Sequence, residues 1–333
     1  SCVGCSEDSS VEDNGEYETS TTQEARSQEV ESSPGTTPSS AVRGLSISVD
    51  NKTGLLNISR MTPEVVGEIG DSGVWTIFVY MCGTDLETNY GMGTGDIAEM
   101  CAASDSDNVR FVVETGGTYE WQNSAVESES IQRFVVQHGA VEAVDEQPRT
   151  SMGSSSTLSD FLLWGVENYA SEHMGVVLWD HGGGSVTGIC FDERENYDSL
   201  SLAELDEALY TYYGQRGRRF DFIGFDACLM GTVETANILA TYADYMYGSE
   251  ETEPGSGWDY TAIGDFLASN PDADGLMLAK VVCDSFLAAC KAQNDDTLTT
   301  LSVIDLGNID TLLNAFNIFA SGMYNVSSNT AVR

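Results

Sequence analysis

Two segments of similar form, MGVVLWDHGGG (residues 174–184) and FDFIGFDACLMG (residues 220–231), decide the fold. Each begins with a short apolar run typical of a buried strand and ends in a turn that contains glycine. If both strands lie parallel in one sheet, His181 and Cys228 emerge at the same edge, where the strands have their carboxyl ends. Open α/β sheets place their chemistry at that edge. A histidine near a thiol is a candidate pair of general acid/base and nucleophile.

The rest of the chain alternates between strand and helix patterns. Apolar runs rich in β-branched and aromatic residues predict strands at residues 74–81, 109–115, 133–137, 174–179, 220–225, 245–251 and 299–306. Apolar residues at helical spacing predict helices at residues 97–103, 157–170, 201–213, 233–242, 275–291 and 309–324. Strands separated by helices of this length predict a mostly parallel sheet with helices on both faces.

The first 44 residues differ in composition from the rest of the chain. They are rich in Ser, Thr, Glu and Gly, and Arg26 and Arg43 are their only cations. Such a segment cannot bury a core, so we expect a flexible acidic tether. SCVGC (residues 1–5) resembles the processing site of bacterial lipoproteins, which makes Cys5 a candidate lipidation site, with Cys2 as the alternative. We therefore expect a bacterial cell-surface or extracellular protein; a plain secreted tail stays open as the other interpretation.

The charge is extreme: 53 acidic against 14 basic side chains give a net charge of −39. Such a field repels nucleic acids and anionic membranes, and it attracts cationic partners such as peptides rich in Arg or Lys. The alternative interpretation is that the negative charge only keeps the protein soluble and attracts no particular partner. Eight cysteines are too few for a disulfide-stapled scaffold of 333 residues, and three histidines with a single CxxC pair predict no zinc site.

The three glycines after His181 indicate a loop that backbone or ligand approaches closely. The backbone N–H groups of Gly182 and Cys228 are candidate donors to a developing oxyanion. In lipases and esterases a loop of the HGGG type supplies the oxyanion hole for a serine in a G-x-S-x-G turn. This chain contains no G-x-S-x-G, because Pro254 and Trp258 stand at the outer positions around Ser256. The esterase interpretation therefore lacks its nucleophile.

The order WDHGGG then DACLMG resembles the clostripain family of cysteine peptidases, in the caspase-like clan. YMCGTDLE (residues 80–87) and SEETEPGSGWDY (residues 249–260) fit the same pattern, so the resemblance covers roughly residues 74–260. It implies a caspase-like three-layer α/β/α sandwich and a catalytic dyad of His181 and Cys228. It also implies that Asp226, two positions before the cysteine, lines the S1 pocket. A buried carboxylate there would select Arg or Lys.

The resemblance implies a cysteine endopeptidase that cleaves after Arg and/or Lys through an acyl-enzyme. Its substrates would be proteins or peptides, and it would meet a membrane only through a lipid anchor. It also implies self-cleavage in the loop between the two motifs, where FDERENYDS makes Arg194 the candidate site. We expect a monomer, with two associated chains after processing as the alternative. The peptidase domain is expected to span residues 45–333, and its continuation past Arg333 stays open.

Two further expectations depend on the acidic residues. Clostripain is calcium-dependent, so the resemblance raises calcium as a cofactor, although no acidic cluster here has the spacing of an EF-hand. No cofactor is otherwise required. The alternative from another functional class is a catalytically silent surface lipoprotein that binds cationic peptides or glycans with its acidic surface.

Overall fold

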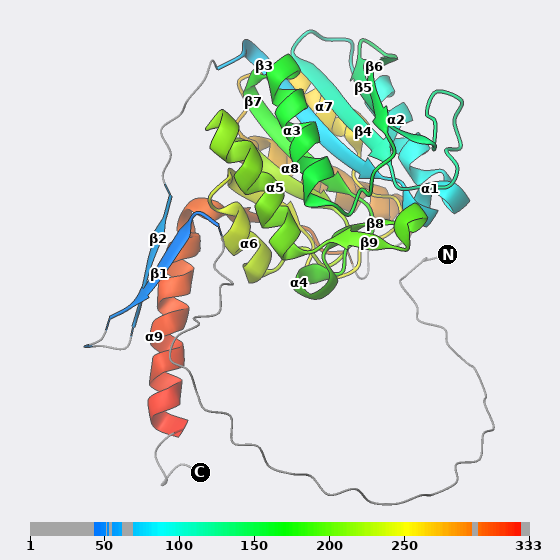
Figure 1. Ribbon diagram of the computed structural model, residues 1–333. Helices are drawn as coiled ribbons and strands as arrows, with labels where there is room; N and C mark the ends of the chain where they lie inside the picture. Colours follow the sequence, from blue (N-terminus) through cyan, green and yellow to red (C-terminus); the bar gives the residue numbers. More distant parts are fainter. Residues whose placement is uncertain (1–42, 51, 53–54, 62–68, 295–298, 328–333) are drawn as a thin grey trace, which may run out of the picture.

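The computed structural model describes residues 43–50, 52, 55–61, 69–294 and 299–327. An eight-stranded sheet, in the order β12-β11-β10-β7-β3-β4-β5-β6, forms its centre (Figure 1). The five parallel strands are β3 (Asp71–Cys82), β4 (Val109–Gly116), β7 (Ser171–Trp179), β10 (Phe220–Asp226) and β11 (Ala243–Gly248). β12 (Ser302–Asp305), β5 (Ser130–Gln137) and β6 (Ala140–Pro148) pair antiparallel. The predicted mostly parallel sheet is confirmed.

Helices cover both faces of this sheet. One face packs against α3 (Ser155–Tyr169), α5 (Leu202–Arg216) and α6 (Val233–Leu239). The other packs against α2 (Met92–Ala102), α7 (Tyr260–Ser269) and α8 (Gly275–Gln293). The central strand β3 shows why two cores form: Phe78 and Tyr80 point into the first, and Ile77 and Val79 point into the second. Together the layers form the predicted α/β/α sandwich.

Local sequence signals fix several helix starts. Ser154 caps α3 by accepting a hydrogen bond from the N–H of Ser156. Ser201 and Glu204 form a reciprocal capping box at the start of α5, as the sequence predicts. The short helices α1 (Thr84–Tyr90) and α4 (Gly184–Thr187) follow β3 and β7 directly.

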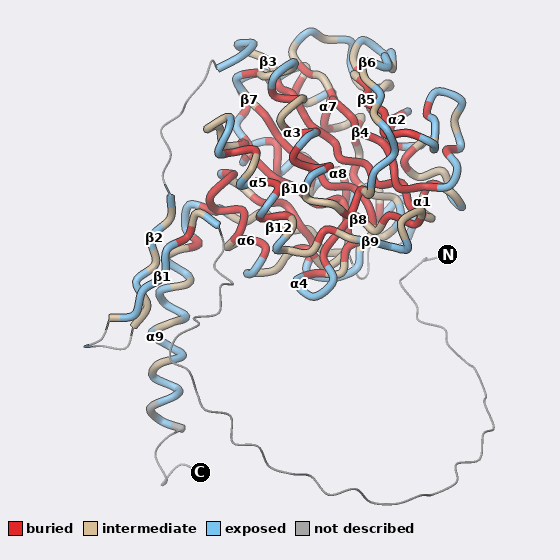
Figure 2. The backbone as a smooth tube through the Cα atoms, viewed as in Figure 1, coloured by how far each residue is buried: buried red, intermediate tan, exposed pale blue. Residues whose placement is uncertain are grey.

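A second, smaller unit stands beside the sandwich. A hairpin of β1 (Leu45–Val49) and β2 (Leu56–Arg60) lies along α9 (Ile309–Ser327), and both extend away from the sheet (Figure 1). Arg60 ties the hairpin to α9 by donating to Asp310 Oδ1 at 2.6 Å, and to α6 of the sandwich by donating to the Asn237 carbonyl at 2.6 Å. Figure 2 shows that the buried residues concentrate in the sandwich, whereas α9 and the hairpin are mostly exposed. No helix in the described part of the chain is long and apolar enough to cross a membrane.

The structure differs from the sequence predictions at some elements. The predicted strand 245–251 ends at Gly248, because residues 249–257 turn back toward the end of β10. The segment FDERENYDS, expected to be a loop, contributes to a small antiparallel ribbon of β8 (Ile189–Asp192) and β9 (Asp198–Leu200) joined by the 3-10 turn η1 (Glu193–Glu195). β6 was not predicted; it is an exposed edge strand with three carboxylates among its nine residues. Residues 1–42 of the proposed tether, with Cys5 among them, lie outside the described residues.

Candidate active site

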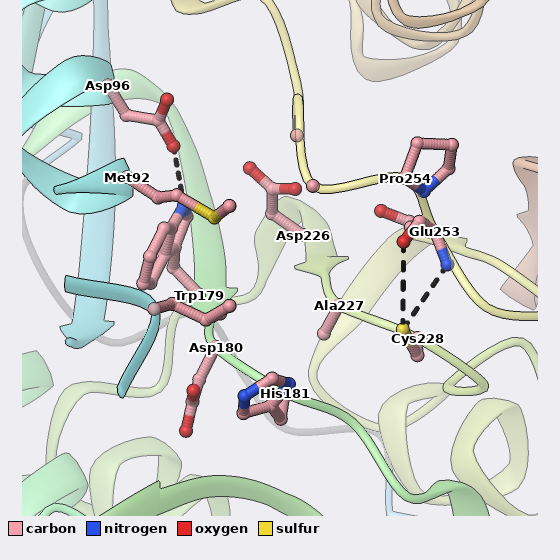
Figure 3. A pocket seen from close by; sticks show the side chains of 13 residues that line it. Met92, Asp96, Trp179, Asp180, His181, Asp226, Ala227, Cys228, Glu253 and Pro254 are labelled. Carbon is pink, nitrogen blue, oxygen red and sulfur yellow. Dashed lines mark hydrogen bonds between the residues drawn. The ribbon is translucent and has the colours of Figure 1, made fainter. Parts of the chain in front are cut away.

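The pairing of β7 with β10 brings the two motifs together. Trp179, the last residue of β7, lies opposite Asp226, the last residue of β10. His181 and Cys228 therefore follow their strands by the same two residues, at the same sheet edge. Both line one pocket with an accessible volume of about 60 Å³, which we call the site pocket (Figure 3). Its lining consists of Leu86, Met92, Asp96, Trp179, Asp180, His181, Asp226, Ala227, Cys228, Glu253, Pro254, Gly255 and Gly257.

The His181 imidazole is held by a carboxylate from α1. Its Nε2 lies 3.0 Å from Asp85 Oδ1, and the two side chains are 27% and 35% exposed. A carboxylate at one ring nitrogen fixes the orientation and the tautomer of a histidine. Nδ1 is then the nitrogen that can exchange a proton with a thiol or a leaving group. The sequence did not reveal this partner, although Asp85 belongs to the DLE turn of residues 85–87.

The other two residues of that turn also serve the site. Leu86 lines the site pocket, and Glu87 is fully buried. The Glu87 carboxylate accepts hydrogen bonds from the N–H and hydroxyl of Thr94, at 2.8 and 2.6 Å, and from the N–H of Gln122 at 2.6 Å. Glu87 thus fixes α1 against α2 and so fixes the position of Asp85.

The sulfur of Cys228 contacts the backbone of the 249–257 segment. The N–H of Glu253 donates to Cys228 Sγ at 3.3 Å, and the Glu253 carbonyl lies 4.0 Å from the same sulfur (Figure 3). An N–H donor stabilises a thiolate over a thiol. The next residue, Leu229, has a positive φ of 64° and donates its N–H to the Glu251 carbonyl at 3.0 Å. The strained turn is therefore held by the same segment that contacts the sulfur.

The glycines after His181 are required by close contacts. A Cβ on Gly182 would lie 2.0 Å from the carbonyl oxygen of Cys228, and a Cβ on Gly183 would lie 1.7 Å from Thr187 Oγ1. Gly184 has a positive φ of 63°. The backbone of the His181 loop therefore touches the backbone of the turn at Cys228.

Asp226 is a buried carboxyl in the wall of the site pocket. Its Oδ2 accepts from the N–H of Trp258 at 3.2 Å and from the hydroxyl of Tyr260 at 3.0 Å. Burial raises the pKa of Asp226 to about 7, against the opposing effect of these two donors. The carboxyl is therefore poised between its neutral and charged forms near neutral pH.

Three more acids, Asp96, Asp180 and Glu253, line the pocket, and the sequence did not single them out. Asp96, on α2, accepts from the indole N–H of Trp179 at 2.6 Å. Burial, followed by the nearby Asp226, raises the pKa of Asp96 well above its usual range. Figure 3 shows Asp226 between Asp96 and Glu253. The signal that could have found Asp96 is a lone carboxylate in an otherwise uncharged stretch of the helix, Met92–Ile97, but helix–sheet packing decides where it points.

Arg194 lies outside the site pocket, in η1. Its guanidinium donates to the Ser128 carbonyl at 2.5 Å and to Glu129 Oε1 at 2.9 Å, and its side chain is only 13% exposed. It also lies over the ring of Tyr119, 5.7 Å from the centroid. In this conformation the Arg194 side chain is bound to the neighbouring loop.

Among the described residues, no group of three or more His, Cys, Asp or Glu side chains could hold a metal ion. The four acids that line the site pocket therefore do not converge as a cation site does. Calcium stays a proposal.

A model of the clostripain family matches residues 79–332. The chain belongs to the clostripain family. It is accordingly a cysteine peptidase, with the caspase-like sandwich that the motifs imply. A search of curated proteins found no match.

Solved structures of similar fold include other clostripain-like proteases. One is iotapain, a secreted C11 cysteine protease of Bacteroides thetaiotaomicron, with 17% identity over 72% of this chain and 68% of that chain, at a TM-score of 0.56. A structure of a secreted C11 protease of that organism with an irreversible peptide inhibitor has 20% identity, the same coverages and a TM-score of 0.56. An inactive zymogen from Parabacteroides distasonis has 20% identity over 74% of this chain and 65% of that chain, at a TM-score of 0.55. At these identities the likeness establishes the fold.

Proposed function

We propose that this clostripain-family peptidase is an endopeptidase that cleaves after Arg and Lys, with Cys228 as nucleophile and His181 as general acid/base. The observation that supports this most is the composition of the site pocket. A thiol, an imidazole and a buried carboxyl line one cavity of which Leu86, Met92 and Trp179 supply apolar walls. Apolar walls suit the methylene stem of a long side chain, and a buried carboxylate suits its cationic end.

The chemistry follows from the two side chains and the backbone between them. His181 Nδ1 takes the proton of the Cys228 thiol, and the sulfur attacks the carbonyl carbon of the P1 residue. The N–H groups of Gly182 and Cys228 donate to the resulting oxyanion. When the C–N bond breaks, the imidazolium returns its proton to the leaving amine. His181 then removes a proton from water, which attacks the thioester and releases the acid and the thiol.

A panel of fluorogenic peptides that differ only at P1 tests this function. Arg and Lys peptides should be cleaved, whereas Gln, Leu and Asp peptides should be cleaved at least about 100-fold more slowly, as expected for loss of a buried charge pair. Cys228→Ala serves as the blank.

The net charge of −39 should also make kcat/KM for basic peptides fall with added salt. If the protein binds cationic peptides without cleaving any of them, the binding function replaces the catalytic one. Assays with and without a chelator test the calcium requirement.

Asp85 has the geometry of a positioning residue for His181. Asp85→Asn is expected to lower kcat by about 10- to 100-fold, because the imidazole loses its orienting charge, and to leave KM nearly unchanged. The rate of Cys228 alkylation by iodoacetamide should fall with it. Asp71→Asn is the control, because Asp71 is an exposed, ion-paired acid at the start of β3 and does not line the pocket. A change in KM alone would contradict the positioning role.

We also propose that the enzyme matures by self-cleavage after Arg194. The contacts of Arg194 with Ser128 and Glu129 must first open, so cleavage should be slow and should occur between molecules or in a locally unfolded loop. Intact-mass measurements on the wild type and on Cys228→Ala provide the test. Two fragments that join at residues 194 and 195 are expected from the wild type only. A wild type that stays one chain while it cleaves peptides would contradict the proposal.

We propose an extracellular location, since a protease of similar fold from Bacteroides thetaiotaomicron is secreted. Attachment through a lipid on Cys5 is the further proposal. Mass spectrometry of the amino-terminal peptide from the native host would detect it.

A further inference from the structure

The Glu253 carboxyl is buried without a partner. Although the residue as a whole is partly exposed, both of its carboxylate oxygens are buried and accept no hydrogen bond from the described residues. By contrast, Asp226 accepts two hydrogen bonds and Asp96 accepts one. A buried carboxylate without a partner destabilises the folded state by roughly several kcal/mol. Proteins therefore seldom retain one unless it has a function.

The position of Glu253 is fixed by its backbone. Its own N–H donates to Cys228 Sγ at 3.3 Å. Its segment is tied to the nucleophile turn by hydrogen bonds from Leu229 N–H to Glu251 O at 3.0 Å and from Gly231 N–H to Ser249 O at 2.7 Å. The segment therefore cannot move away from the pocket without disturbing Cys228.

An acid, Asp226, and a thiol, Cys290, lie near the Glu253 carboxyl. Burial, followed by Asp226 and Cys290, raises the pKa of Glu253 well above its usual range. No cation of the described residues forms an ion pair with it. The empty pocket therefore favours the protonated form of Glu253, and a cation that enters would favour the charged form.

We propose that Glu253 is a second acidic ligand for the P1 side chain and that, with Asp226, it makes the enzyme prefer Arg to Lys. This inference rests on the proposed function. A guanidinium is planar and has five N–H donors, so it can bridge two carboxylates. The ammonium group of Lys is a compact point charge on a shorter side chain, and it pairs well with a single carboxylate. As the guanidinium binds, Glu253 releases its proton to solvent and becomes the second counter-charge.

The test compares Arg and Lys peptides for the wild type and Glu253→Gln. The wild type should prefer Arg, and the substitution should lower kcat/KM for Arg by about 10- to 100-fold, as for one partner of a buried charge pair, and for Lys by much less. The Arg/Lys ratio should therefore contract by about tenfold. The melting temperature should stay the same or rise, because an unpaired acid has been removed; a structural residue would lower it. Glu250→Gln, an exposed acid of the same segment, is the matched control.

Each result decides between the proposals. If the wild type cleaves neither basic peptide, the proposed function fails. If it cleaves both and Glu253→Gln keeps the wild-type ratio, only the role of Glu253 is overturned. If Glu253→Gln does not fold, Glu253→Asp replaces it: the shorter acid should contract the Arg/Lys ratio in the same way, and an unchanged ratio in a folded Glu253→Asp protein overturns the inference.

Discussion

Asp226→Asn is expected to lower kcat/KM for Arg and Lys peptides by about 100- to 1000-fold, the loss typical of a buried counter-charge removed from an ion pair. Asparagine has nearly the same shape and can still accept from Trp258 and Tyr260. The pocket should therefore stay intact while its charge is lost. Cleavage of a peptide with Gln at P1 should fall little, and this peptide is the control for the catalytic groups. Equal loss for Arg and Gln peptides would show that the carboxyl supports the fold and not the specificity.

The pKa of about 7 for Asp226 adds a pH dependence of defined sign. Below pH 7 the carboxyl is protonated and its attraction for a cation is lost, so kcat/KM for basic peptides should fall as the pH drops through 7. Asp96, Glu99 and Glu253 face the same carboxyl and broaden the transition. This decrease of kcat/KM at low pH should be absent from the pH profile of Asp226→Asn. Peptides with a neutral P1 should not show it in the wild type.

Gly182→Ala is expected to reduce kcat by at least about 100-fold, the cost of misplacing a reacting group by about 1 Å. The new Cβ would lie 2.0 Å from the Cys228 carbonyl oxygen and 3.1 Å from Met230 Cγ, so the nucleophile turn must shift. The core layers do not depend on this contact, and circular dichroism should show a folded protein.

Gly214→Ala is the matched control for the same exchange. Gly214 lies within α5, and a Cβ there meets open space. This variant should retain full activity and gain about 0.5–1 kcal/mol in the free energy of unfolding. If Gly182→Ala keeps wild-type kcat, the two loops are more adaptable than their contact indicates, and their proposed role in the oxyanion site is wrong.

The sequence predicts the centre of the fold well and its margins poorly. β3, β7 and β10 are buried on both faces over most of their length, so they appear in the sequence as mostly apolar runs, and the structure confirms them. β6 escaped prediction because none of its residues is buried and four of the nine are polar. The β8–β9 ribbon escaped because its strands have only four and three residues. The conformation of such elements is determined by the strand or loop with which they pair. The local sequence therefore shows no periodicity that would indicate a strand.

The residues of the candidate site also fall into those that the sequence predicts and those that it does not. His181 and Cys228 follow two recognisable strands, and Asp226 ends one of them. The pairing of these strands is enough to bring the three residues to one pocket. Asp85 and Glu253 reach it from α1 and from the segment after β11. Their approach depends on how distant segments pack, which a single sequence does not encode in any short pattern. The family motifs contained both residues but did not state what they contact.

The outer strand β6 has a consequence for assembly. An unpaired strand at the edge of a sheet is a template on which another chain can add a strand. Over nine residues β6 presents the exposed acids Glu142 and Glu146, whereas its third acid, Asp145, pairs with Arg133. Every other copy of this protein carries the same charges. Addition of one β6 to another would set carboxylates against carboxylates across the new ladder. The charges on β6 therefore disfavour the pairing of this edge with the same edge of another copy, so that the sheets of neighbouring molecules do not join into one continuous sheet.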